Sequence, residues 1–557
     1  MELLIMKRLS PYIALLLAWL TLSTQAANHP VERLHTLTDK RLYLSGELLW
    51  LKLCLTDEAG LPLDDSRIGY VELLDESGPV AQAQIALQAG VGEGWLELPA
   101  PLPSGYYRLV AYTRQMRNQG EADRCGQLIA VVNTLREAER VPSDSTLQAP
   151  SQPTESNLRL TLDRSTLARR EQGTLRIEGL PANLHTLAVS IAGEEFMPLP
   201  DLPTAAPIPS TATQSLIDYE GAVIEGTLID LRTGETAQQT NGVTAWLGGI
   251  GNEIQLFSGQ IDATGTVRFY TKGLNGVKEM ATTTQATNGG SYRVDLQSPF
   301  ATHPALQLPP LKVNPAWRRA LTQRHVGLQV TRLFTADSMS RVEPSLPLFH
   351  WTPTKSYRLE EYTHFPTMGE TIFEFVEAVS FRTEQGRHNL FVLLSDLSNN
   401  SVSLHPPLVL LDGIPLLDPE WIYRYDPALV ERIDVYRDRY AFGGQQFEGI
   451  VAFYTHRHNY PTLKLDKRTQ LFDFAGTQPH RRFYAPDYAD TSARESRLPD
   501  YRHTLLWLPE VETNGSAEVT LPFSTSDLPG RYRVSVEGIT REGQRLSGYI
   551  YLLVERN

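Results

Sequence analysis

Two histidines that are separated by a single residue are the best candidates for metal ligands in this sequence. His456 and His458 would lie on one side of an extended strand, where their imidazoles could bind a single metal ion. Zinc sites in proteins use three or four protein ligands, and the sequence around this pair offers no third one. We therefore interpret the pair as the solvated end of a strand, and we expect no metal and no other cofactor.

Carboxylates are the second group that could do chemistry. Asp412 could act as a general base, but it stands in an Asp-Gly pair after an apolar run, which is typical of a tight turn. Glu431, Asp434 and Asp438 could form an acidic cluster, but arginines are interspersed with them, which is typical of a charged outer strand face. The sequence contains no serine-hydrolase elbow, zinc-protease helix, phosphate-binding loop or calcium loop. We predict no catalytic residues and a protein that is not an enzyme.

A stretch rich in tyrosine and arginine near the C-terminus favours binding over catalysis. The sequence reads PHRRFYAPDY from Pro479 and PDYR from Pro499, and both residue types are over-represented at binding hot spots. The alternative is an extended loop that packs on its own protein, as long structured loops often do. We predict a candidate interaction loop that contains Arg481, Arg482, Phe483, Tyr484, Tyr488, Tyr501 and Arg502.

Composition narrows the class of protein that carries these residues. The chain has 557 residues, of which 51 are Lys or Arg and 64 are Asp or Glu, so its net charge is −13. With 41% hydrophobic residues it can form packed cores, which excludes a generally disordered chain. The acidic balance argues against nucleic acid as a partner. Beyond the first thirty residues no apolar run approaches the roughly 18 residues of a membrane-spanning helix, so we expect no transmembrane span.

The first 26 residues have the pattern of a secretory signal peptide. Lys7 and Arg8 precede a short apolar stretch, and small residues follow it up to Ala26. A membrane anchor, the alternative, needs about twice that apolar length. We expect cleavage after Ala26 or Ala27 and export of the mature chain to an oxidising compartment.

The two cysteines are Cys54 and Cys125. Cys54 lies in an apolar strand and Cys125 precedes another, and a disulfide between them would stabilise the fold by about 4 kcal/mol. Two separate buried thiols are the alternative, because side-chain geometry decides the pairing and sequence does not supply it. We predict the disulfide and keep the alternative open.

Strand patterns dominate the rest of the chain, so the predicted fold class is mainly β and multidomain. Short apolar runs between turn residues, at a spacing of roughly ten residues, are typical of β-sandwiches. Helical spacing occurs at 316–330, and a capping box of Thr367 and Glu370 begins another helix with an apolar stripe to Val379. Residues 426–431 are a further helix candidate. We expect consecutive sandwich units, then a mixed α+β domain, then a closing β segment.

Shifts in composition divide the chain into units. Pro, Ser, Thr and Gln are concentrated at 140–157, which indicates a linker, and a second proline-rich break follows at 198–209. The predicted division is a signal peptide at 1–26, a β-sandwich at 27–134, a linker at 135–157, a small β unit at 158–203, a further β domain at 215–310, a mixed α+β domain at 316–460 and a β segment at 461–557.

Motifs in the first unit resemble a macroglobulin-type domain. TDKRLYLSGELLWL from Thr38 and LPSGYYRLVAYT from Leu102 match the opening and closing strands of such domains. The domain at 215–310 is similar to carboxypeptidase-regulatory-like β domains, through residues 221–234 and the turn at 262–265. Full macroglobulins carry a Cys-Gly-Glu-Gln thioester motif. The nearest string here, from Cys125, reads CGQL, so we expect no thioester trapping of proteases.

The mixed domain resembles the plug of TonB-dependent outer-membrane receptors. The matching segments are PLVLLDGIP from Pro407, VERIDVY from Val430 and FEGIVAF from Phe447. In those receptors the plug lies inside a barrel of many strands formed by the same chain. Here only about a hundred residues follow the plug-like domain, so we expect a plug-like domain without its own barrel.

Taken in order, the units resemble an exported Bacteroidota family that carries macroglobulin-type domains followed by a plug-like domain. The resemblance implies a periplasmic protein associated with the outer membrane, with the cell surface as the alternative. The family resemblance says little about activity, but a plug-like domain without its own barrel predicts a non-enzymatic module that docks onto or occludes an outer-membrane transport machine, such as a type IX secretion translocon, with a β-barrel outer-membrane protein as partner. The alternative function is a periplasmic or surface binding or adhesion protein built from stacked β-sandwiches.

Overall fold

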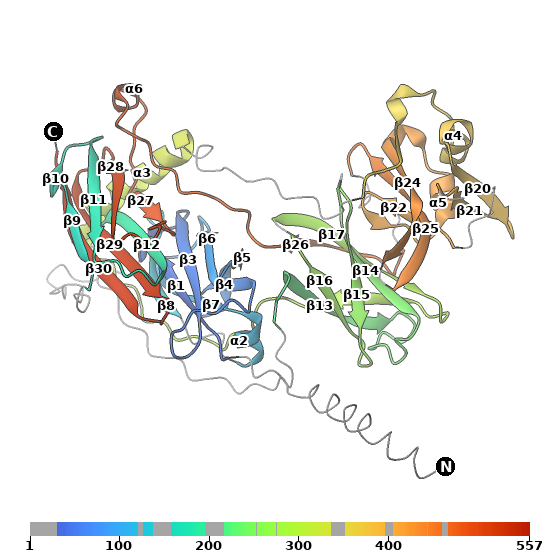
Figure 1. Ribbon diagram of the computed structural model, residues 1–557, viewed down its shortest axis with the longest axis horizontal. Coiled ribbons are helices and arrows are strands. Elements are labelled where there is room, and N and C mark those ends of the chain that lie inside the picture. The colour runs from blue at the N-terminus through green and yellow to red at the C-terminus, as the bar shows by residue number, and fades with distance from the viewer. Residues whose placement is uncertain are drawn as a thin grey trace, which may run out of the picture.

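The computed structural model describes residues 30–120, 126–136, 157–194, 217–335, 351–395, 405–458 and 466–556, apart from residues 252, 275 and 443. Within these ranges the chain forms several packed β-sheets with a few helices, which confirms the predicted mainly β, multidomain class (Figure 1). No helix in this part of the chain is long and apolar enough to cross a membrane. The predicted signal peptide at 1–26 lies outside the described residues.

The first unit, here called the first sandwich, consists of two sheets around one core. Its strands are β1 (Arg33–Thr38), β2 (Leu42–Leu44), β3 (Leu48–Thr56), β4 (Ile68–Leu74), β5 (Pro79–Ala86), β6 (Val91–Glu97), β7 (Gly105–Tyr112) and β8 (Gln127–Val132). One sheet has the order β1-β3-β6 and the other the order β2-β8-β7-β4-β5. Leu49, Leu51 and Leu53 alternate along β3 and face the core, as the two-residue period of a strand requires.

The small β unit and the closing β segment form a single sandwich, which corrects the predicted division of the chain. This composite sandwich contains β9 (Arg159–Leu162), β10 (Thr166–Leu167), β11 (Gln172–Glu178), β12 (Leu184–Gly193), β27 (Thr504–Leu508), β28 (Glu518–Ser524), β29 (Gly530–Thr540) and β30 (Arg545–Val554). Its sheets have the orders β10-β30-β29-β12-β27 and β28-β11-β9. Either half alone has too few strands to bury a core, so residues hundreds of positions apart complete each other.

The third unit is a seven-stranded sheet with the order β18-β13-β16-β15-β14-β17-β26. Its strands are β13 (Ala222–Asp230), β14 (Val243–Gly249), β15 (Gln255–Ile261), β16 (Thr266–Thr271), β17 (Val277–Ala286), β18 (Tyr292–Leu296) and β26 (Gln470–Ala475). The predicted turn joins β15 to β16, where Asp262 accepts hydrogen bonds from the backbone amides of Thr264 and Thr266. The edge strand β26 comes from the segment predicted as part of the closing β unit, so that boundary also differs from the prediction.

The mixed unit at 351–458 has one sheet with helices on one face. The sheet order is β19-β24-β25-β22-β23, from β19 (Lys355–Arg358), β22 (Leu408–Leu411), β23 (Ile414–Pro415), β24 (Val430–Phe442) and β25 (Gln445–Thr455). A hairpin of β20 (Val379–Glu384) and β21 (Arg387–Val392) and the helices α4 (Met368–Phe375) and α5 (Pro419–Tyr423) share a core with this sheet.

The helix predictions for the mixed unit are partly correct. Thr367 caps α4 and accepts a hydrogen bond from the Glu370 amide at 3.3 Å, as predicted. The helix ends at Phe375, however, and Val379 begins β20. Residues 426–431 are not a helix, because a short 3-10 turn at Pro427–Leu429 leads directly into β24.

The helix predicted at 316–330 forms as α3 (Arg318–Thr335), but it packs on the first sandwich and not on the mixed unit. Trp317 and Leu321 lie against Leu42 and Leu44, while Val326 is 46% exposed and leaves the predicted apolar face. Helical spacing predicts that a helix forms, but it does not indicate which sheet the apolar face will meet.

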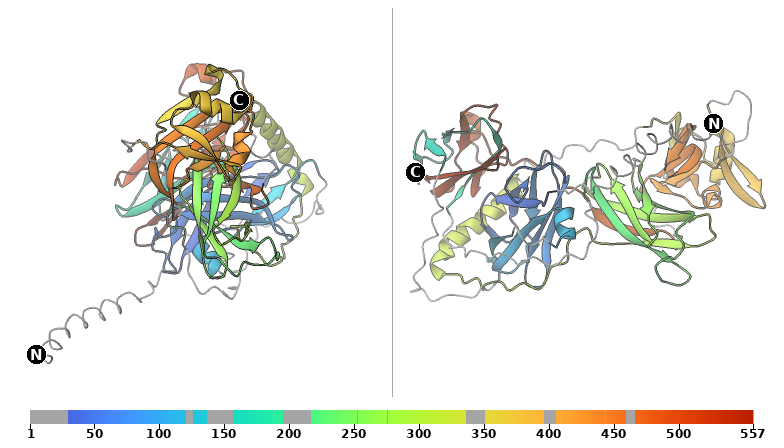
Figure 2. Two further views of the ribbon diagram at one scale, coloured as in Figure 1. Left: turned by 90° about the vertical axis from the view of Figure 1, so that its right-hand side faces the viewer. Right: turned by 60° about the horizontal axis from the view of Figure 1, so that its bottom comes forward.

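The chain runs out along the molecule and then returns. Figures 1 and 2 show the composite and first sandwiches at one end and the seven-stranded sheet and the mixed unit at the other. The buried Arg114, on the short helix α2 (Arg114–Asn118), joins the two halves by donating to the Val223 carbonyl. After β26 the chain crosses the first sandwich again to reach β27. We call residues 476–503 the crossing segment.

Candidate functional site

The crossing segment covers the edge of the sheet β1-β3-β6. The side-chain amide of Gln478 pairs with the backbone of Trp95, as a neighbouring strand would. Its Nε2 donates to the Trp95 carbonyl at 2.7 Å, and its Oε1 accepts from the Trp95 amide at 3.1 Å. Its own amide donates to the Gln84 carbonyl at 2.7 Å. The predicted interaction loop therefore lies on its own protein, as the packed alternative expected.

Side chains beyond Gln478 alternate between the protein and the surface, as they do in an extended chain. Arg481 lies over the rings of Trp95 and Trp50, at 5.0 Å and 5.9 Å from their centroids. Phe483 meets Trp50 edge to face, with centroids 5.8 Å apart. Arg482 and Tyr484 are exposed. The predicted loop thus has an inner row that packs and an outer row that faces solvent.

Two other members of the predicted loop anchor the segment to the composite sandwich. The Tyr488 hydroxyl donates to Asp500 at 3.0 Å, and Arg502 forms an ion pair with the same carboxylate at 2.8 Å. Arg502 also donates to the Leu505 carbonyl at 3.0 Å. Both side chains are buried, and burial raises the pKa of Tyr488. Both side chains hold the segment in place, and Tyr488 does not present a binding surface.

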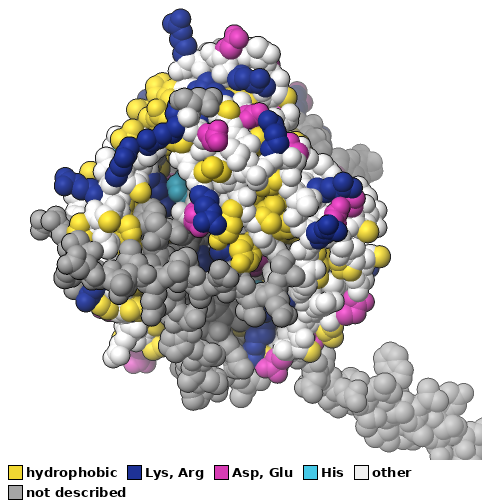
Figure 3. Space-filling view, turned by 90° about the vertical axis from the view of Figure 1, so that its left-hand side faces the viewer, with side chains coloured by type: hydrophobic (Ala, Val, Ile, Leu, Met, Phe, Trp, Pro, Cys, Tyr) yellow, Lys and Arg dark blue, Asp and Glu magenta, His cyan; other side chains and the backbone are white. Residues whose placement is uncertain are grey.

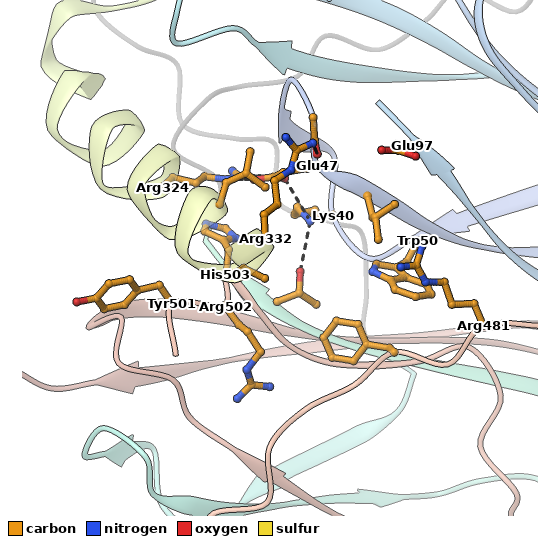
Figure 4. A pocket seen from close by; sticks show the side chains of 16 residues that line it. Lys40, Glu47, Trp50, Glu97, Arg324, Arg332, Arg481, Tyr501, Arg502 and His503 are labelled. Carbon is orange, nitrogen blue, oxygen red and sulfur yellow. Dashed lines mark hydrogen bonds and ion pairs between the residues drawn. The ribbon is translucent and has the colours of Figure 1, made fainter. Parts of the chain in front are cut away.

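A cavity of about 270 Å³ lies where the first sandwich, α3, the crossing segment and the start of β27 meet (Figure 4). We call it the junction cavity. Of the predicted loop it includes Arg481, Phe483, Tyr501 and Arg502. The first sandwich contributes Lys40, Gly46, Glu47, Leu48, Trp50 and Glu97, and α3 contributes Arg324, Leu328, Thr331 and Arg332. His503, at the end of the crossing segment, and Thr504, at the start of β27, complete the wall.

An ion-pair network fixes one wall of the cavity. Arg324 binds the Glu47 carboxylate with two nitrogens, at 3.0 Å and 2.9 Å. Lys40 lies 2.8 Å from Asp39 and 3.6 Å from Glu47. Burial alone would raise the pKa of Glu47, but Arg324 and Lys40 outweigh burial and lower this pKa below its usual value. Glu47 therefore stays ionised, and α3 is attached to the first sandwich by charge.

Arg332 and Arg481 bring further positive charge to the cavity. Arg332 Nη2 donates to the Gly46 carbonyl at 2.6 Å, and Gly46 has a positive φ of 88°. A Cβ at Gly46 would lie 2.7 Å from Arg332 Nη2, so only glycine leaves room for this contact. Burial lowers the pKa of Arg481, but an arginine stays charged in proteins.

His503 closes the cavity beside α3. Its Nδ1 is buried and has no hydrogen-bond partner among the described atoms. Burial, and then the charges of Arg324 and Lys40, lower the pKa of His503 well below its usual value. The ring is therefore neutral at physiological pH and adds polarity without charge.

The remaining sequence candidates have structural roles. Asp412 is buried and accepts from the backbone amide and the hydroxyl of Thr455, at 2.7 Å and 2.8 Å, so it holds the predicted turn. Asp434 is 5% exposed and accepts from Ser356, so it does not lie on a charged outer face as predicted. Within the described ranges no three metal-binding side chains come together.

The predicted disulfide is not formed in the structure, where Cys54 is a buried free thiol. Its predicted partner, Cys125, lies outside the described residues. Burial raises the pKa of Cys54 to about 11.

Most of the cavity wall was missed by sequence reasoning, because only Arg481, Phe483, Tyr501 and Arg502 belong to the predicted loop. Lys40, Glu47 and Trp50 lie within the motif that resembles a macroglobulin-type domain, but that resemblance gave them no role. Arg324 and Arg332 lie on α3 among other polar residues, where charge usually indicates a solvated face. Nothing in the residue types of α3 indicated that these two arginines line a cavity.

Comparisons with known proteins find likeness at the level of fold. No protein-family model and no curated protein matches the sequence. A structure of alpha-2-macroglobulin from Escherichia coli is 12% identical over 95% of this chain and 40% of that chain, with a TM-score of 0.24. A Salmonella alpha-2-macroglobulin is 11% identical over 96% of this chain, with a TM-score of 0.23. The Escherichia coli adhesin FdeC is 10% identical over 46% of this chain and 60% of that chain, with a TM-score of 0.15.

These likenesses concern macroglobulin-like and adhesin-like β domains and not what those domains bind. The chain spans about 40% of the length of the macroglobulins it matches. The charged side chains at the composite-sandwich end are spread over the surface, as Figure 3 shows, and Arg176 there pairs with Glu518. In the junction cavity, by contrast, cations and aromatic rings converge.

Proposed function

We propose that the protein is an exported, non-enzymatic binding protein whose ligand site is the junction cavity. The observation that carries this proposal is the cavity itself, which four separated stretches of the chain build together. Clefts between domains are common places for ligands, because several elements can each contribute a fixed polar group. Here the fixed groups are Arg332, Arg481 and the neutral His503, beside the ring of Trp50.

The side chains of the cavity wall are held in place without a ligand. Glu47 and Arg324 hold each other in a two-bonded pair, and Gln478 fixes the crossing segment on β6. A site whose side chains are already held loses little conformational entropy when a ligand binds. This arrangement supports binding of a small ligand by a rigid site.

A panel of small molecules tests the proposal, with the melting temperature as readout. A ligand that binds only the folded protein raises the melting temperature by mass action. Leu328→Trp would fill the cavity, whereas Leu333→Trp changes a side chain on the same helix that is 79% exposed. We expect at least one compound to stabilise the unaltered protein and Leu333→Trp but not Leu328→Trp. A panel whose effects are equal in all three proteins would contradict the proposal.

Docking onto an outer-membrane transport machine, including a type IX secretion translocon, is a second proposal. It is favoured by α4, where the Phe373 side chain is 86% exposed, whereas Phe375 on the same helix packs on Tyr362 and the core. A large aromatic side chain exposed to this extent on a helix face suits a contact surface. The other face of the mixed unit is already covered by the seven-stranded sheet, so only the helical face could meet such a partner.

Recovery of the protein with outer membranes tests this second proposal. We expect Phe373→Ser to reduce recovery with membranes several-fold without lowering stability, because the side chain is exposed. Equal recovery of both proteins would contradict a role for this face.

A further inference from the structure

We infer that the junction cavity selects a small monocarboxylate that carries one planar ring. This inference rests on the proposed function, because it names the ligand class of the same cavity. It depends on three properties of the wall: a guanidinium with donors directed into the cavity, two perpendicular aromatic rings, and a volume that holds only a small ligand.

The guanidinium is that of Arg332. It has five N–H donors, and the contacts of the described residues use one of them, to the Gly46 carbonyl. Lys40 also points into the cavity (Figure 4), but Asp39 and Glu47 already share its charge. Arg332 is therefore the group best placed to bind a carboxylate, through two parallel hydrogen bonds.

The aromatic rings are those of Trp50 and Phe483. They meet at an interplanar angle of 84°, so they form two walls at a right angle. A planar ring set against both would stack on one and meet the edge of the other, and both arrangements are favourable for aromatic pairs. Leu48 and Leu328 extend this apolar side of the cavity.

Charge and size limit the ligand further. Glu47 is already paired with Arg324 and Lys40, and the remaining cations of the wall outnumber Glu97, so the cavity favours an anion. The volume of about 270 Å³ is small beside the roughly 300–1,000 Å³ of pockets for drug-sized ligands. One ring with one carboxylate fits these limits, whereas inorganic phosphate would leave the aromatic walls without a partner and a longer polymer would exceed the volume.

Calorimetric titration of the purified chain with three probes tests the inference. The probes are phenylacetate, its neutral analogue phenylacetamide, and inorganic phosphate. We expect saturable one-to-one binding of phenylacetate, binding of the amide weaker by about tenfold, and no saturable binding of phosphate.

Variants assign the binding to the cavity. Arg332→Gln should weaken phenylacetate by about tenfold, and Phe483→Ala by a similar factor. The matched controls are Arg482→Gln and Tyr484→Ala, because these neighbours lie on the exposed side of the same segment. We expect both controls to bind within twofold of the unaltered protein.

The outcomes separate this inference from the proposed function. If the amide binds as tightly as phenylacetate, or phosphate competes with it, the ligand class is wrong. If phenylacetate does not bind but another compound stabilises the protein in a way that Leu328→Trp abolishes, the inference fails and the binding function stands. If no compound does so, both fail.

Discussion

Two of the junctions between β units in this molecule are built from different chemistry. Between the seven-stranded sheet and the mixed unit, the contact is a continuous apolar core that contains Trp246, Leu256, Leu410, Phe447 and Ile450. Between the first and composite sandwiches, the contacts are polar. They include Lys52 with Glu510 at 2.8 Å and Thr504 with Asp39 at 2.8 Å.

The difference indicates what each junction does. A mainly apolar contact joins two units into one body, because its stability comes from buried area. A polar contact is stable only where each buried donor meets an acceptor, and a cavity can remain where such pairs are absent. The junction cavity lies at the polar junction, so the proposed ligand site occurs where the two units meet through polar groups.

Removing the central side chain of the apolar junction should have the largest effect. Trp246 is 1% exposed and stacks on Phe442 with centroids 5.4 Å apart. We expect Trp246→Ala to lower the free energy of unfolding by about 3–5 kcal/mol, measured by urea denaturation. Trp351→Ala is the control, because Trp351 is 39% exposed, and it should cost about 1 kcal/mol or less. Similar losses for both would remove the distinction between a core and a surface aromatic.

The second-largest effect should be a loss of stability at the polar junction when the pH is lowered. His35 packs beside Arg545 of the composite sandwich, and burial, followed by Arg545 and Arg33, lowers its pKa to about 4. The unfolded chain takes up this proton near pH 6.5 and the folded chain only near pH 4, so stability falls as the pH falls between these values. The loss from this group is at most about 3 kcal/mol.

His35→Gln isolates this contribution from those of other titrating groups. We expect the variant to lose less stability than the unaltered protein between pH 6.5 and pH 4, in denaturation curves recorded at both pH values. Identical pH dependence in the two proteins would show that His35 is not protonated at a lower pH in the folded state.

Substitutions of the two partners in the Lys52–Glu510 ion pair should lower stability by unequal amounts, and by less than the two changes above. The Lys52 side chain is 1% exposed and Glu510 is 37% exposed, so only the lysine depends on its partner for solvation. We expect Glu510→Gln to cost about 1–3 kcal/mol and Lys52→Met about 1 kcal/mol or less, in thermal denaturation. The reverse order would mean that the junction depends on the acid and not on the buried amine.

The smallest expected effect is a slow alkylation of the Cys54 thiol, and its rate reports on the polar junction alone. The thiol lies in β3 under the composite sandwich, and its pKa is raised to about 11, so it should react slowly in the folded protein at pH 8. The labelling rate then measures how often the polar junction opens. Mass spectrometry in denaturant without reductant also tests the predicted disulfide, because two labelled thiols would exclude it.

Local features could be predicted from the sequence, because their causes are local. The cap at Thr367, the alternation along β3 and the turn at Asp262 each depend on neighbours within a few residues. The partner of each strand does not. Arg176 and Glu518 pair across 342 residues, and nothing in either segment indicates the other. The composite sandwich was therefore predicted as two units.

The site shows the same limit. Residue types singled out 479–502, a stretch that includes part of the junction cavity wall, but they did not separate Arg481 and Phe483 from Arg482 and Tyr484. An extended chain alternates its side chains, so the separation was available from spacing once the segment was known to be extended. The contribution of α3 was not available, because it depends on which sheet the helix meets.

The return of the chain through the crossing segment has a consequence for the proposed export. Strands β9 to β12 would leave a translocation channel several hundred residues before their partners β27 to β30, so the first group would wait unpaired. Pairing at such long separation in sequence is slow, and unpaired strands invite association with other chains. We therefore expect a chaperone to protect this early half during export. The proposed ligand site includes residues 481–504, so it forms only after all the separated stretches of its wall have left the channel.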